Sequence, residues 1–260
     1  MNNPTVVLSL KELTKKYPGV LALDSVSIDF LEGEVHALLG ENGAGKSTLI
    51  KAVAGAIRLD GGMICNAGQD YAQMTPHLSR SLGIEVIYQE FNLVPTMSVA
   101  ENIFLCDRVG SRLLVDYAAM WRKSREIFQL FDVDIDPAAL VRDLSPAKQQ
   151  IVEIAKAVSK NVKILIMDEP SAPLSVSEVE HMFEIIQRLR QNGISIIYIS
   201  HRLEEVFRIS DRVSVMRDGR YLATKRTKDT NRQELINLMV GRELKESYPR
   251  HANPPGEAAL

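Results

Sequence analysis

The N-terminal part of the chain opens with an alternation of apolar and polar positions. Val26, Ile28 and Phe30 are apolar, and the residues between them are polar. A period of two is typical of a half-buried β-strand. Residues 35–39 are more continuously apolar, which is typical of a strand buried in a parallel sheet. The pattern therefore predicts two strands, joined by a turn at 32–33.

Beyond these strands, strand-like and helix-like segments alternate. Apolar runs at 84–88, 163–167 and 194–199 predict three more strands, and helical spacing follows residue 48. A capping-box pair, Ser175 and Glu178, predicts the start of a helix that Gly193 ends. Alternating strands and helices favour an α/β fold with a mostly parallel sheet.

Three further segments complete the predicted organisation. Residues 99–157 have a helical pattern, which predicts a helical insertion that includes 117–131. The segments Asp60-Gly61-Gly62 and Asp218-Gly219 each predict a hairpin turn. The tail from Pro249 onward carries prolines and no periodic pattern, so we expect a linker or a cut end there.

Composition narrows the functional classes. The chain has 260 residues, 45% of them hydrophobic and 25% charged, which are globular proportions. Its net charge of −2 gives no electrostatic case for binding nucleic acid. Its two cysteines, Cys65 and Cys106, have no metal or redox spacing, so a reducing cytosol is expected. Residues 1–4 show no leader, and no run reaches the ~18 apolar residues of a membrane helix, so a link to a membrane would run through a partner.

The strongest chemical motif lies between the second strand and the helix after it. Gly40-Glu41-Asn42-Gly43-Ala44-Gly45-Lys46-Ser47 matches the P-loop pattern. Glycines let backbone N–H groups close around phosphate oxygens, and the helix N-terminus adds positive potential. Lys46 would bridge the β- and γ-phosphates, and the hydroxyl of Ser47 would bind Mg²⁺. The alternative is a glycine-rich turn with a surface lysine.

A pair of carboxylates follows the strand at 163–167. Asp168 stands at the strand end, where a parallel sheet presents functional groups, and is the candidate Mg²⁺ partner through water. Glu169 comes next and could face the γ-phosphate and orient the attacking water. The alternative is an acidic pair at a solvated rim, which the neighbouring P-loop disfavours.

Together these motifs resemble the ATP-binding subunits of ABC transporters over nearly the whole chain. Gln89 stands where that family has its Q-loop glutamine, and His201 where it has its switch histidine. Leu144-Ser145, followed by two glutamines, occupies the position of the signature motif, and Tyr17 that of an aromatic residue that stacks on adenine. Read without the family, Tyr17 would be a packed strand residue, Gln89 a polar loop residue and His201 a structural histidine.

The resemblance implies a fold, a site and its ligands. The fold is a P-loop core with a mostly parallel sheet, an N-terminal antiparallel β subdomain and a helical subdomain at about 95–157, within a domain at 5–245 followed by a linker or cut end at 246–260. The catalytic residues are Glu169, His201 and Gln89, and the Mg²⁺ residues are Ser47, Gln89 and Asp168. The ATP-binding residues are Tyr17, Gly40, Glu41, Asn42, Gly43, Ala44, Gly45, Lys46, Ser47, Thr48, Ser145 and Ala147.

A narrower likeness is to the ATPases of monosaccharide importers. It is carried by Phe91–Ile103, Ser200–Phe207 and Met239–Leu244. In that subfamily two nucleotide-binding halves are fused, and this chain is similar to the first half. The implied partners are a second nucleotide-binding domain (a tandem half or a second copy), transmembrane permease subunits and, indirectly, a sugar-binding protein. The implied location is the cytoplasmic face of the cell membrane, held there by the permease.

The sequence departs from the family at two places. Pro146, Ala147 and Lys148 stand where the family has Gly-Gly-Gln after Leu-Ser. Pro146 has no N–H, Ala147 adds a methyl group and Lys148 adds a charge, so the site capped by this segment is expected to work poorly. Ser175 stands where many members have aspartate, and Pro173 should stiffen the loop before it.

Three functions therefore remain open. The leading hypothesis is an ATPase subunit that powers sugar uptake. The second is a soluble ABC-type ATPase without a transporter, against which the near-neutral charge weighs. The third is a nucleotide-binding half with little turnover alone. A P-loop kinase is a distant fourth, because no acceptor site or lid pattern is evident.

Overall fold

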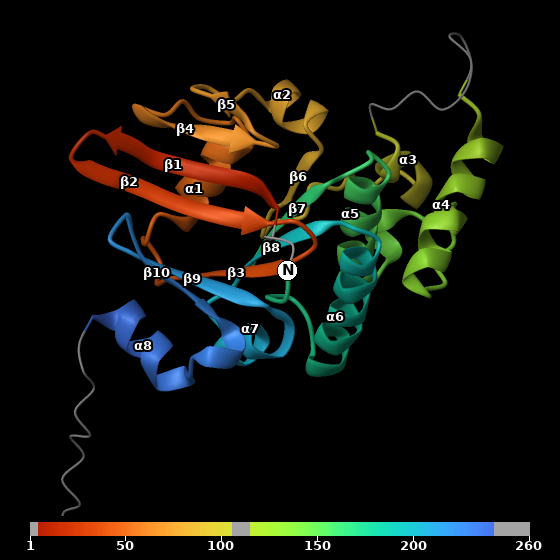
Figure 1. Ribbon diagram of the computed structural model, residues 1–260. Coiled ribbons are helices and arrows are strands. Elements are labelled where there is room, and N and C mark those ends of the chain that lie inside the picture. Colours follow the sequence, from red (N-terminus) through yellow and green to blue (C-terminus); the bar gives the residue numbers. More distant parts are fainter. Residues whose placement is uncertain (1–4, 106–114, 242–260) are drawn as a thin grey trace, which may run out of the picture.

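The computed structural model describes residues 5–105 and 115–241, and within them two sheets stack with helices between and around them (Figure 1). The strands are β1 (Val6–Tyr17), β2 (Val20–Leu31), β3 (Val35–Leu39), β4 (Gly61–Asn66), β5 (Gln69–Tyr71), β6 (Ile84–Ile87), β7 (Ile164–Asp168), β8 (Ser195–Ile199), β9 (Arg212–Arg217) and β10 (Arg220–Arg226). The helices are α1 (Lys46–Val53), α2 (Pro76–Ser81), α3 (Val99–Ile103), α4 (Tyr117–Phe131), α5 (Pro146–Val158), α6 (Val176–Gln191), α7 (Leu203–Ile209) and α8 (Arg232–Val240). The expectations about residues 1–4, Cys106 and 246–260 lie outside the described residues.

The larger sheet has the strand order β10-β9-β3-β8-β7-β6. Its strands β9, β3, β8, β7 and β6 pair in parallel, and β10 joins β9 as an antiparallel hairpin. The smaller sheet, β2-β1-β4-β5, is antiparallel throughout. This arrangement confirms the α/β fold class with a mostly parallel sheet and an N-terminal antiparallel sheet.

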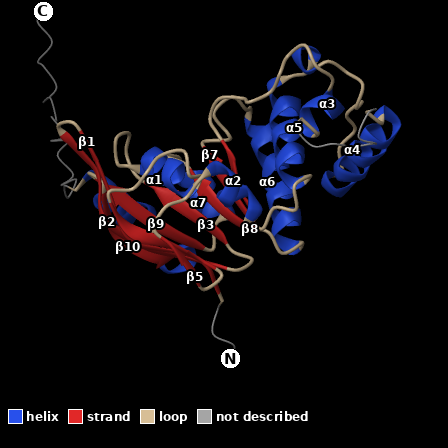
Figure 2. Ribbon diagram, turned by 90° about the horizontal axis from the view of Figure 1, so that it is seen from above, coloured by secondary structure: helices blue, strands red, loops and turns tan. Residues whose placement is uncertain are grey.

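Alternate residues of the central strands face two different cores. In β7, Ile164 and Ile166 pack with α1 and the antiparallel sheet, whereas Leu165 and Met167 pack with α5 and α6. Both faces of the strand are therefore buried, which explains why the segment is apolar without alternation. Figure 2 shows the resulting shape: α3, α4, α5 and α6 gather at one end, and β1, β2 and β10 lie at the other.

Most elements lie where the sequence predicts them. The capping box of Ser175 and Glu178 begins α6, and α3, α4 and α5 occupy the described part of the predicted helical segment. Asp218 and Gly219 form the β9–β10 turn, and both have positive φ (51° and 76°). That conformation is typical of a two-residue hairpin.

The predicted hairpin turn at Asp60-Gly61-Gly62 is wrong. Strand β4 begins at Gly61, and the hairpin turn lies at Ala67-Gly68, where φ is positive at both residues. Gly62 serves a different purpose, since a Cβ there would lie 2.5 Å from the carbonyl oxygen of Glu12. The register of β1 and β4 shifts between Lys11 and Thr14, so the glycine marks a close backbone approach at a bulge.

Candidate functional site

The glycine-rich loop connects β3 to α1 and is shaped by its contacts with β2. Gly45 is the N-cap residue of α1 and has φ +97°. A Cβ at this position would lie 2.6 Å from the carbonyl oxygen of Ala22, so a side chain is excluded as well as strained. No side chain caps α1, and its first-turn N–H groups are therefore available to an anion.

The β9–β10 hairpin supports the same loop from the other side. A Cβ on Gly40 would lie 2.5 Å from the carbonyl oxygen of Met216, and Gly219 N–H donates to the Ala44 carbonyl at 3.2 Å. Sequence reasoning found the turn at Asp218-Gly219 but did not connect it to the loop. The parallel pairing of β3 with β9 makes that connection, and it joins segments about 175 residues apart.

Lys46 lies inside the loop rather than on the surface. Its side-chain Nζ donates to the carbonyl oxygens of Gly40 at 2.7 Å and of Glu41 at 3.1 Å. Burial lowers the pKa of Lys46, while the charges of Glu169 and Asp168 raise it. A buried ammonium group near two carboxylates, cradled by carbonyl oxygens, excludes the alternative of a surface lysine in an ordinary turn.

Two carboxylates stand at the carboxyl end of β7. The strand ends at Asp168, and Glu169 turns out of it with φ +47°, its N–H donating to the Ile199 carbonyl at 3.0 Å. Burial, and then the charge of Glu169, raise the pKa of Asp168, while Lys46 and Lys51 lower it. Packing two acidic groups into a part-buried position fits a site that a cation neutralises.

His201 faces Glu169 across the neighbouring strand ends. Parallel pairing of β7 with β8 sets Asp168 opposite Ile199, so the residues that follow each strand lie together. Nδ1 of His201 lies 3.0 Å from Oε1 of Glu169. The imidazole side chain is 55% exposed and the carboxylate 16%, so the pair points from the protein toward solvent. The loop, both carboxylates and the histidine thus share one edge of the sheet.

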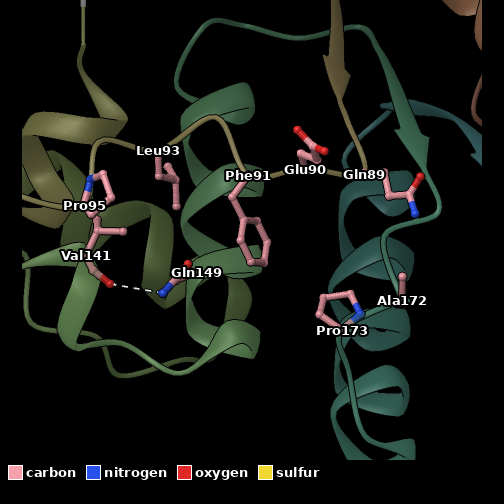
Figure 3. A pocket seen from close by; sticks show the side chains of 9 residues that line it. All are labelled: Gln89, Glu90, Phe91, Leu93, Pro95, Val141, Gln149, Ala172 and Pro173. Carbon is pink, nitrogen blue, oxygen red and sulfur yellow. Dashed lines mark hydrogen bonds between the residues drawn. The ribbon is translucent and has the colours of Figure 1, made fainter.

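Gln89 follows β6, the next strand of the sheet, and lines an open cleft of about 770 Å³. The cleft separates the end of the sheet from the helical part, and the ring of Phe91 lies between its Gln149 and Pro173 sides (Figure 3). Nε2 of Gln149 donates to the carbonyl oxygens of Val141 at 3.3 Å and Leu144 at 3.1 Å. The cleft is lined by Gln89, Glu90, Phe91, Leu93, Pro95, Val141, Gln149, Ala172 and Pro173.

Two predicted groups lie apart from this edge. Ser145 is the N-cap of α5 and accepts a hydrogen bond from Lys148 N–H at 3.4 Å, with Pro146 at the first helical position. Both views place α5, whose first turn includes Ala147, away from α1 (Figures 1 and 2). Tyr17 ends β1 with 41% of its surface exposed, and Nζ of Lys15 lies 5.3 Å from its ring centre.

Within the described residues, clustered metal-ligating side chains and membrane-length helices are both absent. In residues 5–105 and 115–241, no three His, Cys, Asp or Glu side chains gather into a metal-binding group. The helices within these ranges include none that is long and apolar enough to cross a bilayer.

The chain is similar to a known protein family and to curated ribose import proteins. Residues 23–172 match the family model described as ABC transporter. The chain is 49% identical to the ribose import ATP-binding protein RbsA 1 of Rubrobacter xylanophilus over 98% of its own length, and 43% identical to RbsA of Geobacillus kaustophilus. It covers 51% and 52% of those proteins, so it spans about half the length of the curated relatives it matches.

Solved structures agree with this placement. A nucleotide-free ATP-binding cassette from an ABC transporter superposes with a TM-score of 0.79 at 26% identity, covering 92% of this chain and 96% of that one. The ADP conformation of another ATP-binding cassette gives a TM-score of 0.80 at 26% identity, over 92% of this chain and 100% of that one. With the family model covering more than half of its residues, the chain belongs to the ABC transporter family.

Proposed function

We propose that this chain binds ATP at the Gly40–Thr48 loop and hydrolyses it. The observation that carries the proposal is the convergence of three distant segments at one sheet edge. Lys46 lies between the carbonyl oxygens of the loop, Asp168 and Glu169 follow β7, and His201 contacts Glu169 at 3.0 Å. A phosphate chain on this loop would meet the ammonium group of Lys46 and the open amides of α1.

The residues also fit a Mg²⁺ ion bound together with the nucleotide. The hydroxyl of Ser47 lies in the first turn of α1. Burial, and then the charge of Glu169, raise the pKa of Asp168, so a cation beside it would favour its charged form. Gln89 is the third proposed ligand, from the end of β6. When bound, the ion would neutralise charge on the β- and γ-phosphate oxygens. Ser47 would hold it from the first turn of α1 and Asp168 from the end of β7.

Glu169 and His201 supply the remaining roles. Glu169 would orient the attacking water or accept its proton, because its carboxylate turns out of the strand toward the sheet edge. His201 engages Glu169 through Nδ1, which leaves Nε2 to contact the γ-phosphate, as a donor when the ring carries both protons. Positioning and charge stabilisation, rather than covalent chemistry, would carry the reaction.

The test of this assignment is Glu169→Gln. The variant keeps the shape of the side chain and removes its charge, so we expect ATP binding to persist while turnover falls by about 100-fold or more. Steady-state phosphate release and equilibrium ATP binding measure the two effects. Glu184→Gln, an exposed change on α6, is the control and should leave both unchanged. Unaltered turnover in Glu169→Gln would remove Glu169 from the reaction.

The transport role extends the proposal to the longer protein. Its curated relatives are named ribose import ATP-binding proteins, so the activity would power uptake of a monosaccharide. The cleft beside Gln89, with the apolar side chains of Phe91 and Leu93, would receive a segment of the permease. Closure on ATP against a second nucleotide-binding domain, a tandem half or a second copy, would move that segment. The protein would then sit at the cytoplasmic face of the membrane, and a sugar-binding protein would deliver the substrate.

Co-purification separates this role from that of a soluble ABC-type ATPase. Affinity isolation from membranes solubilised in mild detergent should recover multispanning permease subunits with the chain. Recovery of nucleic acid or ribosomes instead would contradict the transport role.

A second candidate function rests on the Pro146-Ala147-Lys148 segment. These residues replace the uncharged Gly-Gly-Gln of the family signature, so a site capped by this segment would have a methyl group and a cation at its phosphate. The chain would then bind ATP and turn it over little by itself. Tight MgATP binding with negligible hydrolysis would favour this candidate.

A further inference from the structure

His201 is framed by two residues that share one buried acceptor. Ser200 precedes it and Arg202 follows it, and both donate to the carboxylate of Glu205. The Ser200 hydroxyl lies 3.0 Å from Oε2, and the Arg202 guanidinium lies 3.2 Å from Oε1. Ser200 Oγ also accepts the N–H of Arg202 at 2.9 Å, which closes the turn around the histidine.

A third donor ties Glu205 to the sheet core. The Tyr198 hydroxyl donates to Oε2 of Glu205 at 2.8 Å from the fully buried strand β8. Tyr198 also packs edge-on against Phe183 of α6, with ring centres 6.1 Å apart. One carboxylate therefore ties the loop that carries His201 to the buried strand β8.

The burial of this carboxylate marks it as a built feature. Glu205 is 6% exposed, although it stands on the short helix α7 next to an exposed glutamate, Glu204. A buried carboxylate is costly unless hydrogen bonds satisfy it, and here three side chains do so. His201 itself is largely exposed and receives one side-chain contact, from Glu169. Its position therefore depends on the flanking residues that Glu205 holds.

We propose that Glu205 is a positioning residue that fixes Ser200 and Arg202 and so holds His201 against Glu169, where it reads the γ-phosphate. The inference rests on the proposed function, because it assumes that His201 contacts the terminal phosphate of ATP. It adds a residue that touches neither nucleotide nor metal. Loss of its charge should release the histidine without disturbing the Gly40–Thr48 loop.

The test compares affinities for MgATP and MgADP in Glu205→Gln and in His201→Ala. In both variants the ratio of ATP affinity to ADP affinity should fall about tenfold. A loss of this size is expected when one hydrogen bond to a charged group is removed. ADP affinity should stay unchanged in both, because the loop is intact. Glu204→Gln is the matched control: it makes the same change one residue away, at a side chain that is 68% exposed and paired with Arg232.

A double variant separates positioning from general destabilisation. If Glu205 acts through His201, Glu205→Gln in the His201→Ala background should add no further loss of ATP preference. Additive losses would overturn the inference. Should Glu205→Gln fail to fold, Tyr198→Phe removes one of the three donors and should give a smaller loss in the same direction, and no loss there would also overturn it.

The outcomes for the two proposals are distinct. Lost ATP preference in His201→Ala with full preference in Glu205→Gln would reject the role of Glu205 alone. Full preference in His201→Ala would remove His201 from the phosphate site and reject the inference, while ATP binding and turnover at the Gly40–Thr48 loop would still stand.

Discussion

At the scale of single residues, backbone conformation at the glycine-rich loop determines which substitutions the site tolerates. Gly43 and Gly45 both have positive φ, but only Gly45 faces a neighbouring carbonyl oxygen, that of Ala22. The P-loop spacing in the sequence identifies both glycines. It does not reveal that β2 closes over one of them, because that contact depends on how the antiparallel sheet stacks on the loop.

We predict that Gly45→Ala destabilises the protein more than Gly43→Ala. The left-handed conformation alone costs an alanine about 1–2 kcal/mol, which both variants incur. Gly45→Ala adds a contact of 2.6 Å between its Cβ and the Ala22 oxygen, so its loss should be larger. Urea unfolding without nucleotide gives the two free energies. Equal losses would mean that β2 does not close on Gly45.

A second residue-scale feature is the buried polar cluster around His36. Its Nδ1 lies 2.9 Å from Glu34 Oε1, and its Nε2 lies 2.7 Å from Ser214 Oγ. His36 is fully buried, and Arg212 contacts the same glutamate at 3.2 Å. Burial lowers the pKa of His36 in the folded state, although Glu34 opposes the change. The apolar pattern at 35–39 predicts the buried strand but not these partners.

Stability should therefore fall as pH falls below about 6.5. The unfolded chain takes up a proton near the ordinary pKa of histidine, whereas folded His36 resists protonation to lower pH. The stabilising contribution of neutral His36 is complete above about pH 6.5 and is lost as the pH falls toward the lower pKa of the folded state. In His36→Gln, the unfolding free energy should depend less on pH between about 7.5 and about 5.5. The same slope in both proteins would show that His36 does not titrate on unfolding.

At the scale of elements, hydrophobic periodicity predicts those strands and helices whose signals lie within one short segment of the sequence. The strand at 35–39 and the helix from Ser175 are examples, since burial on both faces and a capping box leave local signals. The turn predicted at Asp60-Gly61-Gly62 is wrong because a glycine pair can indicate either a tight turn or a close approach of two backbones. Only the packing of β4 on β1 decides between them.

Helix α5 carries the prediction that belongs to this scale. Pro146 fixes the first helical position and Ser145 caps it, which favours the helix, while Ala147 and Lys148 occupy the face that would meet phosphate. Changing the three residues to glycine, glycine and glutamine should lower the free energy of unfolding by about 1–2 kcal/mol, because glycine gives the unfolded backbone more freedom.

Turnover should rise in the same variant, since the methyl group and the charge are gone. Lys148→Gln alone is the control that removes the charge without altering the backbone. Phosphate release and thermal melting of the three proteins separate the two effects. A folded triple variant with unaltered turnover would show that the segment does not limit hydrolysis.

At the scale of the whole molecule, the candidate site is a product of strand order. Neighbouring positions of β3, β8, β7 and β6 bring the loop, His201, Glu169 and Gln89 to one edge, although they span residues 40 to 201. The sequence predicts each group at a strand end, and family resemblance predicts their joint role. Hydrophobic periodicity does not determine the order of the strands in the sheet. The contacts that Gly219 and Glu205 make can therefore be seen only in the folded structure.

The same view explains why one chain is an incomplete site under the proposed mechanism. Ser145 caps α5 and Ala147 belongs to its first turn, and α5 lies away from α1 in both views. If they cap a phosphate, it is bound to another nucleotide-binding domain. Hydrolysis should then depend on association between two chains or two halves.

The most direct measurement is steady-state ATP hydrolysis with Mg²⁺ over a wide range of protein concentration, with ATP binding followed in parallel. We predict that ATP binds at every concentration and that turnover per chain rises as chains associate. Turnover per chain that is independent of concentration would contradict a composite site. Failure to bind MgATP would contradict the central claim that Lys46, Asp168, Glu169 and His201 form a nucleotide site.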